Sequence, residues 1–227
     1  MQAQAKTSLT QMAGFVALMC AVVALSNYLV QSGENGPLFP VNFQLGPINL
    51  ADLLTWAAFT YPVAFFVTDL TNRRFGPRQA HIVVLAGFAL AVVLSIWLAT
   101  PRIAIASGTA FLVAQLLDVS IFNRMRRRTW WKAPLISSII GSLIDTLIFF
   151  TLALAPFFSG IDLFFGMEDG SLGFAVPFLT FGPEVPLWAS LAFGDFCVKI
   201  VVGLAMLIPY GVLLRVSSPA WEQGQRA

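Results

Sequence analysis

Long apolar stretches separated by short polar connections run along most of the chain. A membrane-spanning helix needs about 20 predominantly apolar residues. Six segments meet this requirement: Met12–Val30, Leu53–Asn72, Ala80–Ala99, Ile103–Phe122, Ala133–Ala155 and Leu187–Leu214. The longest connections, 31–52 and 156–186, leave no room for a soluble domain. The pattern predicts an all-α integral membrane protein with six transmembrane helices, forming a single membrane domain over residues 1–227.

The composition supports a membrane protein and narrows its function. Hydrophobic residues make up 58% of the 227 residues and charged residues only 11%, whereas about 25% are charged in soluble domains. A net charge of +2 is too small to indicate a nucleic-acid partner. Cys20 and Cys197 both lie inside apolar runs without a CxxC pair, so the sequence indicates neither a disulfide framework nor a metal site. We therefore expect no metal and no cofactor.

The distribution of basic residues predicts the orientation of the spans. Short cytoplasmic loops of membrane proteins are enriched in lysine and arginine. With six spans, one side of the membrane receives nearly all of these residues: Lys6, Arg73, Arg74, Arg78, Arg124, Arg126, Arg127, Arg128, Lys132, Arg215 and Arg226. The other side receives only Arg102, with the acids Glu34, Asp162, Glu168, Asp169 and Glu184. We expect both termini to be cytoplasmic.

The outer connection from Pro156 to Pro186 combines four acids with seven phenylalanines. A fully solvated loop would not be so aromatic. One interpretation is an interfacial segment that rests on the outer leaflet or on the helix ends. The other is a lid over a cavity that faces outward.

Three ionisable residues are predicted to lie at similar depth in the membrane. At a helical rise of about 1.5 Å per residue, Asp145 lies roughly 18 Å from the cytoplasmic end of its span. Counted from the outer end of the last span, Asp195 lies roughly 12 Å deep and Lys199 roughly 18 Å. Asp195 and Lys199 also share a helical face, because they are four residues apart.

Ionisable residues inside a span are functional-site hypotheses by default, because an unpaired charge is costly there. The simpler interpretation is an ion pair between Asp195 and Lys199 that holds the last helix in register. It leaves Asp145 without a charged partner. The alternative is a polar cavity that contains all three side chains.

Polar and aromatic positions on other spans fit such a cavity. Small and polar residues follow helical spacing on the fifth span and end at an aromatic: Ser138, Gly141, Ser142, Asp145 and Phe149. Gln115, Asn27 and Trp56 lie on the fourth, first and second spans. Small residues alone more often indicate close helix packing, but together with acids and amides they predict a ligand site.

Two further acids lie close to the cytoplasmic ends of their helices. Asp69 precedes Arg73 by four residues, and Asp118 precedes Arg124 by six. We expect structural ion pairs of Asp69 with Arg73 and of Asp118 with Arg124 that fix the cytoplasmic loops. A gate that opens when these pairs break is the functional alternative.

Enzymatic functions find little support. The single histidine, His81, lies at the mouth of the third span, so no buried Ser-His pair is available. The motif GxGD of intramembrane aspartyl proteases and the phosphate-binding GxxxxGK[ST] are both absent. A small-molecule carrier and a purely structural membrane subunit remain. The polar groups on several spans favour the carrier.

Specific motifs resemble the YhhQ-like queuosine precursor transporters, also described as the vitamin uptake transporter family. The resemblance rests on these stretches: SNYLVQ at 26–31, TWAAFTYPVAFFVTDLTNRRFG at 55–76, QLLDVSIFNRMRRRTWWKAP at 115–134, GSLIDTLIFF at 141–150, GDFCVKI at 194–200 and PYGVLL at 209–214. They reach every predicted span except the third. The outer connection looks longer than is usual for the family.

The resemblance implies a bacterial inner-membrane importer of the 7-deazaguanine bases preQ0 and preQ1 for queuosine salvage into tRNA. It also implies a fold similar to the six-helix substrate-binding subunits of energy-coupling-factor transporters. The family generally works alone, so an ATPase module is not expected; a substrate-binding subunit that needs such a module is one alternative. Transport of another vitamin or nucleobase is another, and small-residue helix faces leave a homodimer open.

A 7-deazaguanine suits the predicted cavity. Its N1–H and exocyclic amine form a paired donor edge that one carboxylate can accept, and we assign Asp145 or Asp195 to that edge. Lys199 would balance charge or contact the ring carbonyl, and Gln115 or Asn27 would bond the carbonyl or the 7-substituent. The flat ring would stack on Phe149, Trp56 or Phe196. Downhill facilitation and proton coupling through Asp145 or Asp195 both remain open as mechanisms.

Overall fold

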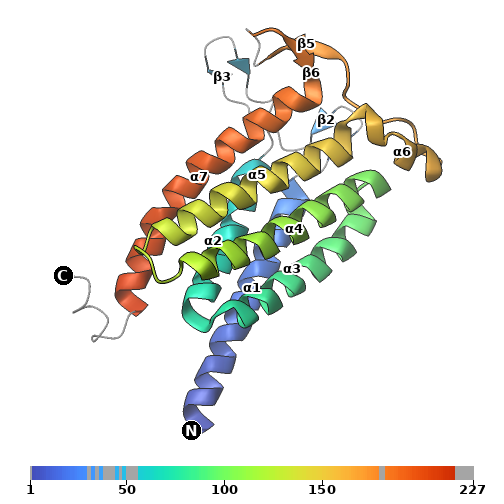
Figure 1. Cartoon of the computed structure of the whole chain (residues 1–227). Helices are drawn as coiled ribbons and strands as arrows, with labels where there is room; N and C mark the ends of the chain where they lie inside the picture. The colour runs from blue at the N-terminus through green and yellow to red at the C-terminus, as the bar shows by residue number, and fades with distance from the viewer. Residues whose placement is uncertain are drawn as a thin grey trace.

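The computed structural model is a bundle of long helices, and it describes residues 2–29, 56–178 and 182–217 together with four dipeptide strands. The long helices are α1 Gln2–Leu29, α2 Ala57–Phe75, α3 Pro77–Leu98, α4 Pro101–Met125, α5 Lys132–Leu154 and α7 Leu187–Ser217. They run roughly along one direction in Figure 1. Two short hairpins, β1 Ser32–Gly33 with β2 Gly36–Pro37 and β3 Gln44–Leu45 with β4 Ile48–Asn49, lie between α1 and α2 in the chain.

Glycine and proline set several of the helix boundaries. Gly76 ends α2 with a positive φ of 93°, a conformation that favours glycine, and Pro77 opens α3. Pro101 opens α4 in the same way after the extended Thr100. The residue before a proline is disfavoured in helical conformation, and α5 ends before Ala155, which precedes Pro156.

Five of the predicted spans correspond to helices that are long and apolar enough to cross a membrane, judged within the described residues. They are Thr10–Leu29, Pro77–Leu98, Pro101–Met125, Lys132–Leu154 and Leu187–Leu214. The remaining predicted span, Leu53–Asn72, corresponds to α2, which starts at Ala57 and is less apolar. Residues 53–55 lie outside the described part of the chain. Six spans therefore stay a prediction.

Helix α2 occupies the centre of the bundle, and this position explains its composition. It packs against α1, α3, α4, α5 and α7. Its buried residues include the polar side chains of Thr68, Asp69, Thr71 and Asn72. A helix that faces other helices can carry polar groups that would be unfavourable against lipid, so low hydropathy does not remove α2 from the bundle.

The connection between α5 and α7 has its own structure at one end of the bundle. It contains a 3₁₀ turn at Pro156–Phe158, the short helix α6 Gly160–Phe164 and a hairpin of β5 Ala175–Pro177 with β6 Glu184–Pro186. We call this the hairpin end, and we call the opposite end, with Arg73, Arg74 and the loop 126–131, the basic end. Backbone N–H groups of Leu172 and Trp188 donate to the carbonyls of Leu154 and Leu172, which ties the connection to α5 and α7.

Several aromatic side chains of this connection point outward. Phe157 is 88% exposed and Phe164 is 80% exposed. Large exposed aromatic groups at the end of an apolar bundle suit a membrane–water interface. This favours the interfacial interpretation over a lid that seals a cavity with its aromatic rings.

Candidate functional site

The centre of the seam between α5 and α7 holds a buried cluster of three charged side chains. The Nζ of Lys199 on α7 lies 2.7 Å from Oδ2 of Asp145 on α5 and 2.5 Å from Oδ2 of Asp195 on its own helix. The side chain of Lys199 is only 4% exposed, and each aspartate side chain is 12% exposed. The predicted convergence of these three side chains is therefore confirmed, and the ion pair between Asp195 and Lys199 also includes Asp145.

Thr146 completes the hydrogen bonding of this cluster. Lys199 donates to its Oγ1 at 3.1 Å, and that hydroxyl donates to Oδ2 of Asp195 at 2.8 Å. The three protons of the ammonium thus have three acceptors, Asp145, Asp195 and Thr146. With both acids ionised, the cluster holds one negative charge in excess. A ligand that donates hydrogen bonds would complement it.

The sequence creates this geometry through helical spacing. Asp195 and Lys199 lie one turn apart on α7, and Asp145 and Thr146 are consecutive on α5. One turn earlier, Gly141 lets α2 approach closely. A Cβ added there would lie 2.7 Å from the ring of Phe65. The small residues of α5 thus serve packing against α2 as well as access to the cluster.

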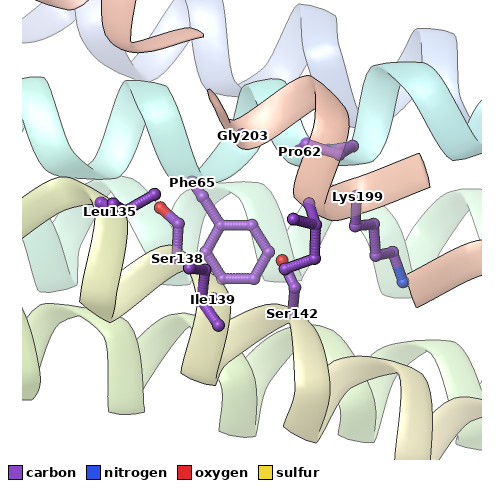
Figure 2. Close-up of a pocket in the computed structure, with 9 residues that line it drawn as sticks. Pro62, Phe65, Leu135, Ser138, Ile139, Ser142, Lys199 and Gly203 are labelled. Carbon is purple, nitrogen blue, oxygen red and sulfur yellow. The ribbon is translucent and has the colours of Figure 1, made fainter. Parts of the chain in front are cut away.

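A pocket lies beside the cluster, between α2, α5 and α7, and we call it the seam pocket (Figure 2). It is lined by Pro62, Phe65, Leu135, Ser138, Ile139, Ser142, Lys199, Ile200 and Gly203. Lys199 enters it from α7 at one edge, and the ring of Phe65 lies across its middle. Its enclosed space fits about one water molecule. A bicyclic base would require the helices to separate.

Two predicted amide contacts belong to other helix seams. Gln115 is 1% exposed and accepts a hydrogen bond from Thr68 at 2.7 Å, which joins α4 to α2. Asn27 donates to the carbonyl of Val23 and accepts from Ser95 at 3.4 Å, between α1 and α3. Neither residue lines the seam pocket.

The predicted aromatic walls are not gathered around the seam pocket either. Trp56 is 50% exposed at the start of α2 and contacts Phe59. Phe149 lies one turn beyond Asp145 and contacts Phe150 edge-on. Phe196 is half-buried next to Asp195 on α7. Phe65, which the sequence analysis did not select, is the aromatic residue that lines the pocket. Its place one turn before Asp69 on the central helix was the available signal.

The ion pairs predicted for Asp69 and Asp118 do not form, so that expectation is wrong. Asp69 accepts hydrogen bonds from Ser137 at 3.3 Å and Ser138 at 3.2 Å. Asp118 is fully buried, and neither carboxylate oxygen has a hydrogen-bond partner among the described residues. Arg124 is exposed near the end of α4.

Arg73 turns to the basic end instead of toward Asp69. Its guanidinium donates to the hydroxyl of Tyr210 at 3.1 Å and to the backbone carbonyls of Arg126 and Trp130, and it lies over the ring of Phe122. A long arginine side chain near a helix end reaches the interface more easily than the bundle interior. This explains why spacing of four residues did not produce an ion pair.

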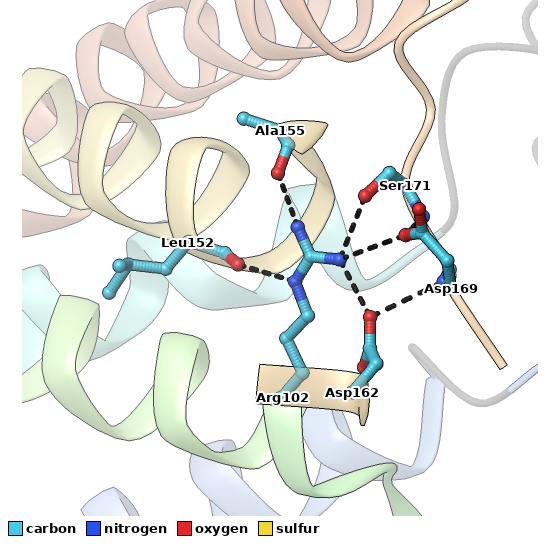
Figure 3. Close-up of polar contacts among 7 residues, drawn as sticks. Arg102, Leu152, Ala155, Asp162, Asp169 and Ser171 are labelled. Carbon is cyan, nitrogen blue, oxygen red and sulfur yellow. Dashed lines mark hydrogen bonds and ion pairs between the residues drawn. The ribbon is translucent and has the colours of Figure 1, made fainter. Parts of the chain in front are cut away.

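Arg102 is the buried residue that sequence reasoning did not select. It is 1% exposed at the start of α4, and it donates to the carbonyls of Leu152 at 2.8 Å and Ala155 at 2.5 Å. It also contacts Asp162 at 2.7 Å and Ser171 at 3.0 Å (Figure 3). One arginine thus fastens the α5–α7 connection to α4 and α5. The available signal in the sequence was that Arg102 is the one basic residue predicted on the outer, acid-rich side.

Asp169 lies at the edge of the contact between Arg102 and Asp162. One of its oxygens lies 3.6 Å from Arg102, and its side chain accepts a hydrogen bond from the backbone N–H of Ser171 at 2.9 Å. Hydrogen bonds from Ser171 lower the pKa of this exposed carboxyl. It therefore keeps its charge beside the guanidinium at neutral pH.

Among the described residues, no group of three or more His, Cys, Asp or Glu side chains is placed to hold a metal ion. The polar chemistry available at the α5–α7 seam consists of two carboxylates, one ammonium and one hydroxyl. Such a set can bind and orient a polar small molecule by hydrogen bonds.

Comparison with known proteins decides the family. The model of the family described as "Putative vitamin uptake transporter" matches residues 55–100 and 95–213. The chain belongs to the vitamin uptake transporter family. These matches cover every helix that contributes to the seam pocket, and with the apolar helices they establish a multi-pass membrane transport protein.

Three relatives carry consistent names. A Haemophilus influenzae protein named "Probable queuosine precursor transporter" is 32% identical over 86% of this chain and 83% of its own length. The Escherichia coli protein named "Queuosine precursor transporter" is also 32% identical, over 86% of this chain and 82% of its length. A Bacillus subtilis relative with the first name is 29% identical over 41% of this chain. No solved structure matches the chain significantly.

Proposed function

We propose that this transporter imports queuosine precursors, the 7-deazaguanine base preQ0 and also preQ1, across the bacterial inner membrane for tRNA queuosine salvage. The observation that carries the proposal is the Lys199–Asp145–Asp195 cluster, set at mid-length between α5 and α7 next to the seam pocket. The names of two relatives that align with 86% of the chain support the substrate class.

The chemistry of the cluster matches a guanine-like edge. Each aspartate uses Oδ2 toward Lys199, and in the described residues no hydrogen bond reaches Oδ1 of either acid. The N1–H and exocyclic amine of the base present adjacent donors, which one carboxylate can accept together. Lys199 or Thr146 would bond the ring carbonyl, and Phe65 offers an aromatic face for stacking.

The base enters only when the seam opens. The pocket fits about one water molecule in this closed arrangement, so substrate binding must separate α5 and α7 near Lys199. The cluster resists that separation because Lys199 links Asp145 to α7. A substrate that replaces part of this link on one aspartate would lower the cost of opening. Binding and opening are thereby coupled through the same three side chains.

The proposal also includes the topology and partners. Helix α2 completes six spans, both termini face the cytoplasm, and the chain works as a single membrane domain without an ATPase module. The basic end, with Arg73, Arg74 and the loop 126–131, faces inward under the rule that short cytoplasmic loops are basic. A homodimer and a fold similar to the substrate-binding subunits of energy-coupling-factor transporters are compatible with this arrangement.

Queuosine rescue tests the function. The protein is expressed in a strain that cannot make preQ0 and lacks its own importer, and tRNA is assayed for queuosine after growth on preQ0 or preQ1. We expect rescue by the wild type. Asp145→Asn and Asp195→Asn should each reduce rescue more than tenfold at limiting preQ0, because each removes an acceptor for the donor edge and weakens the hold on Lys199.

Two observations would contradict the proposal. Failure of the wild type with both precursors, together with rescue of uptake for another nucleobase or vitamin, would change the substrate. Undiminished rescue and binding by both aspartate variants, with normal amounts of folded protein, would remove the cluster from the binding site. Glu168→Gln, an exposed acid in the α5–α7 connection, is the matched control and should behave like the wild type.

A further inference from the structure

A second pair of acids lies in the bundle apart from the Lys199 cluster. Asp69 on α2 is 1% exposed and Asp118 on α4 is fully buried. Side chains near Asp69 contact residues near Asp118 across the α2–α4 seam: Thr68 donates to Gln115 at 2.7 Å, and Asn72 donates to the carbonyl of Val119 at 3.1 Å. The two acids therefore lie at the same level of this seam. Asp69 receives two hydroxyl donors, whereas both oxygens of Asp118 lack a partner in the part of the chain that is described.

No positive charge from the described residues balances this pair. Where side chains are described, the elements packed against α2 and α4 carry these ionisable groups: Cys20 and Tyr28 on α1, Tyr61, Arg73 and Arg74 on α2 itself, Arg78 and His81 on α3, Arg102 and Arg124 on α4 itself, Lys132 and Asp145 on α5, Asp162 on α6, and Asp195, Cys197, Lys199 and Tyr210 on α7. None of the described lysines, arginines and His81 forms an ion pair with Asp69 or Asp118.

The nearest basic residues are already engaged. Lys199 is shared by Asp145 and Asp195, and Arg102 contacts Asp162 at the hairpin end. Arg73, one turn from Asp69, contacts Tyr210 and two backbone carbonyls. The charge on each of the two buried acids is therefore opposed mainly by its like-charged neighbour.

Two adjacent carboxylates cannot both stay ionised in such a place. An isolated charge in an apolar interior neutralises by protonation when no partner is present, and two carboxylates that share a site hold a proton between them because like charges repel. A protonated Asp118 gains one O–H donor, which can bond Asp69. A single proton would thus satisfy oxygens that otherwise have no donor.

We propose that Asp69 and Asp118 form a proton-carrying site that couples import to the proton gradient. The inference rests on the proposed function, because it assigns the coupling ion to that same transport reaction. Protonation of the pair neutralises one charge, and release of the proton toward the cytoplasm restores it. The only bond that forms and breaks is the O–H bond of the protonated carboxyl, whose proton arrives from the outer side and leaves to the cytoplasm.

The structure connects this pair to the substrate cluster through α5. Ser138 donates to Asp69 and also lines the seam pocket beside Lys199. A second pocket, toward the basic end, is lined by Asp69 and Tyr210 and shares Pro62, Ser138 and Gly203 with the seam pocket. A shift of α5 that opens the seam would move Ser138 away from Asp69. Substrate entry would thereby change how well a charge on Asp69 is stabilised.

The Lys199 cluster is the less suitable proton carrier. Its acids share an ammonium at 2.7 Å and 2.5 Å, so a proton on either one would replace an ion pair. The Asp69–Asp118 pair lacks such a cation, and a proton there relieves repulsion. The two acidic sites thus have different roles: the Lys199 cluster binds the base, and the Asp69–Asp118 pair binds the proton.

Transport into proteoliposomes tests the inference. Purified full-length protein is reconstituted with the membrane potential clamped, and preQ0 uptake is measured with equal pH on both sides and with a pH difference of one unit. One unit corresponds to about 1.36 kcal/mol per proton, so one-to-one coupling should raise the internal preQ0 level about tenfold above the external level. Asp118→Asn and Asp69→Asn should still equilibrate preQ0 but lose this accumulation.

A spectroscopic measurement gives a readout independent of transport. Infrared spectra of the purified protein at neutral pH should show the carbonyl band of a protonated carboxylic acid. The band should disappear in the Asp69→Asn/Asp118→Asn double variant and persist in Glu168→Gln. Asparagine has the shape of a protonated aspartic acid, so the double variant should stay folded. If it does not, each single variant should weaken or shift the band.

The outcomes separate the two proposals. Equilibration of preQ0 by the wild type without an effect of the pH difference would overturn the proton site and leave the proposed function intact. Accumulation driven by a sodium gradient instead, or accumulation that survives in both single variants, would also overturn it. If the wild type does not transport preQ0 at all, the proposed function fails. The infrared band alone then decides whether the pair holds a proton, and its absence would refute the pair as a proton site.

Discussion

At the residue scale, the main determinant is whether each buried charge finds a partner. Lys199 finds three acceptors, Arg102 finds a carboxylate, a hydroxyl and two carbonyls, and Asp118 finds no donor among the described residues. Membrane interiors penalise unsatisfied charge strongly. The first two sites are therefore satisfied as they stand, whereas Asp118 is unsatisfied and belongs to the site at which we propose a proton.

Removing the Lys199 ammonium should destabilise the protein. Lys199→Met leaves Asp145 and Asp195 facing each other without a cation, and loss of one partner from a buried ion pair costs about 3–5 kcal/mol. We expect a lower thermal unfolding temperature in detergent and loss of preQ0 uptake. Adding Asp195→Asn should recover part of the stability, because it removes one unpaired charge.

Lys132→Met is the matched control for this variant. Lys132 begins α5 and contacts the ring of Trp131 outside the cluster, 5.6 Å from its centroid. It should shift the unfolding temperature little, since cation–π contacts at exposed sites contribute about 0.5–1 kcal/mol. A Lys199→Met protein as stable as the wild type would show that the three side chains are not paired in the folded protein.

At the element scale, the approach of α2 to α5 positions the seam pocket. Gly141 lies against the ring of Phe65, which is 4% exposed and cannot swing into solvent. Ser138 and Ser142 flank this contact on the same face of α5 and line the pocket. Small residues at this seam therefore set the distance between the central helix and the helix that carries Asp145.

Gly141→Ala should disturb transport through this contact. The added methyl group would overlap Phe65 and push α5 from α2, and overpacking of this kind costs about 1–3 kcal/mol. We expect reduced preQ0 uptake per folded molecule, measured after quantifying the protein by size-exclusion chromatography. Gly14→Ala on α1 has nothing within 4 Å of the added Cβ and should leave uptake unchanged. Equal uptake by both variants would contradict a positioning role for the α2–α5 seam.

The α5–α7 connection should loosen when Arg102 is removed. Arg102→Met leaves Asp162 buried without its cation at 2.7 Å, and it frees the carbonyls at the end of α5. We expect protease cleavage between α5 and α7 to be at least tenfold faster than in the wild type. Gel electrophoresis measures this cleavage. Arg102→Lys should rescue only in part, because a lysine cannot reproduce the guanidinium fork.

Arg128→Met in the exposed loop at the basic end is the matched control and should leave cleavage unchanged. Wild-type protection of the connection in Arg102→Met would mean that the backbone hydrogen bonds from Leu172 and Trp188 alone hold it.

At the scale of the whole molecule, the charge distribution along the bundle axis predicts the orientation in the membrane. The basic end carries Arg73, Arg74 and three consecutive arginines at 126–128, whereas the hairpin end carries Asp162, Glu168, Asp169 and Glu184 with Arg102 buried among them. Short basic loops stay on the cytoplasmic side.

Reporter fusions test this orientation. A green fluorescent protein fused to the end of the chain should fluoresce, because its fold forms in the cytoplasm. Alkaline phosphatase inserted after Gly170 in the α5–α7 connection should be active, because it matures outside the inner membrane. The same enzyme inserted in the loop 126–131 should be inactive. The reverse pattern would invert the topology, and fluorescence with inactive phosphatase at both sites would mean that α5 and α7 do not cross the membrane.

The sequence by itself determined the helices and the common level of three charged residues along the bundle. Five apolar runs correspond to helices, four of them within three residues at each end, whereas α1 begins ten residues before the predicted Met12. The agreement arises because length and hydropathy are properties of the chain alone. Helical rise is fixed by the backbone, so counting residues placed Asp145, Asp195 and Lys199 at one level before any packing was known. The motifs also indicated the vitamin uptake transporter family.

Only the tertiary structure decided which neighbour each polar side chain reaches. Spacing placed Asp69 with Arg73, but rotation of α2 in the centre of the bundle turned Asp69 toward Ser137 and Ser138 on α5. Gln115 and Asn27 likewise bond within other helix seams. Helical periodicity in the sequence predicts which face of a helix carries a side chain. It does not predict which neighbouring helix that face contacts. For that reason, the proton site proposed at Asp69 and Asp118 emerges only from packing.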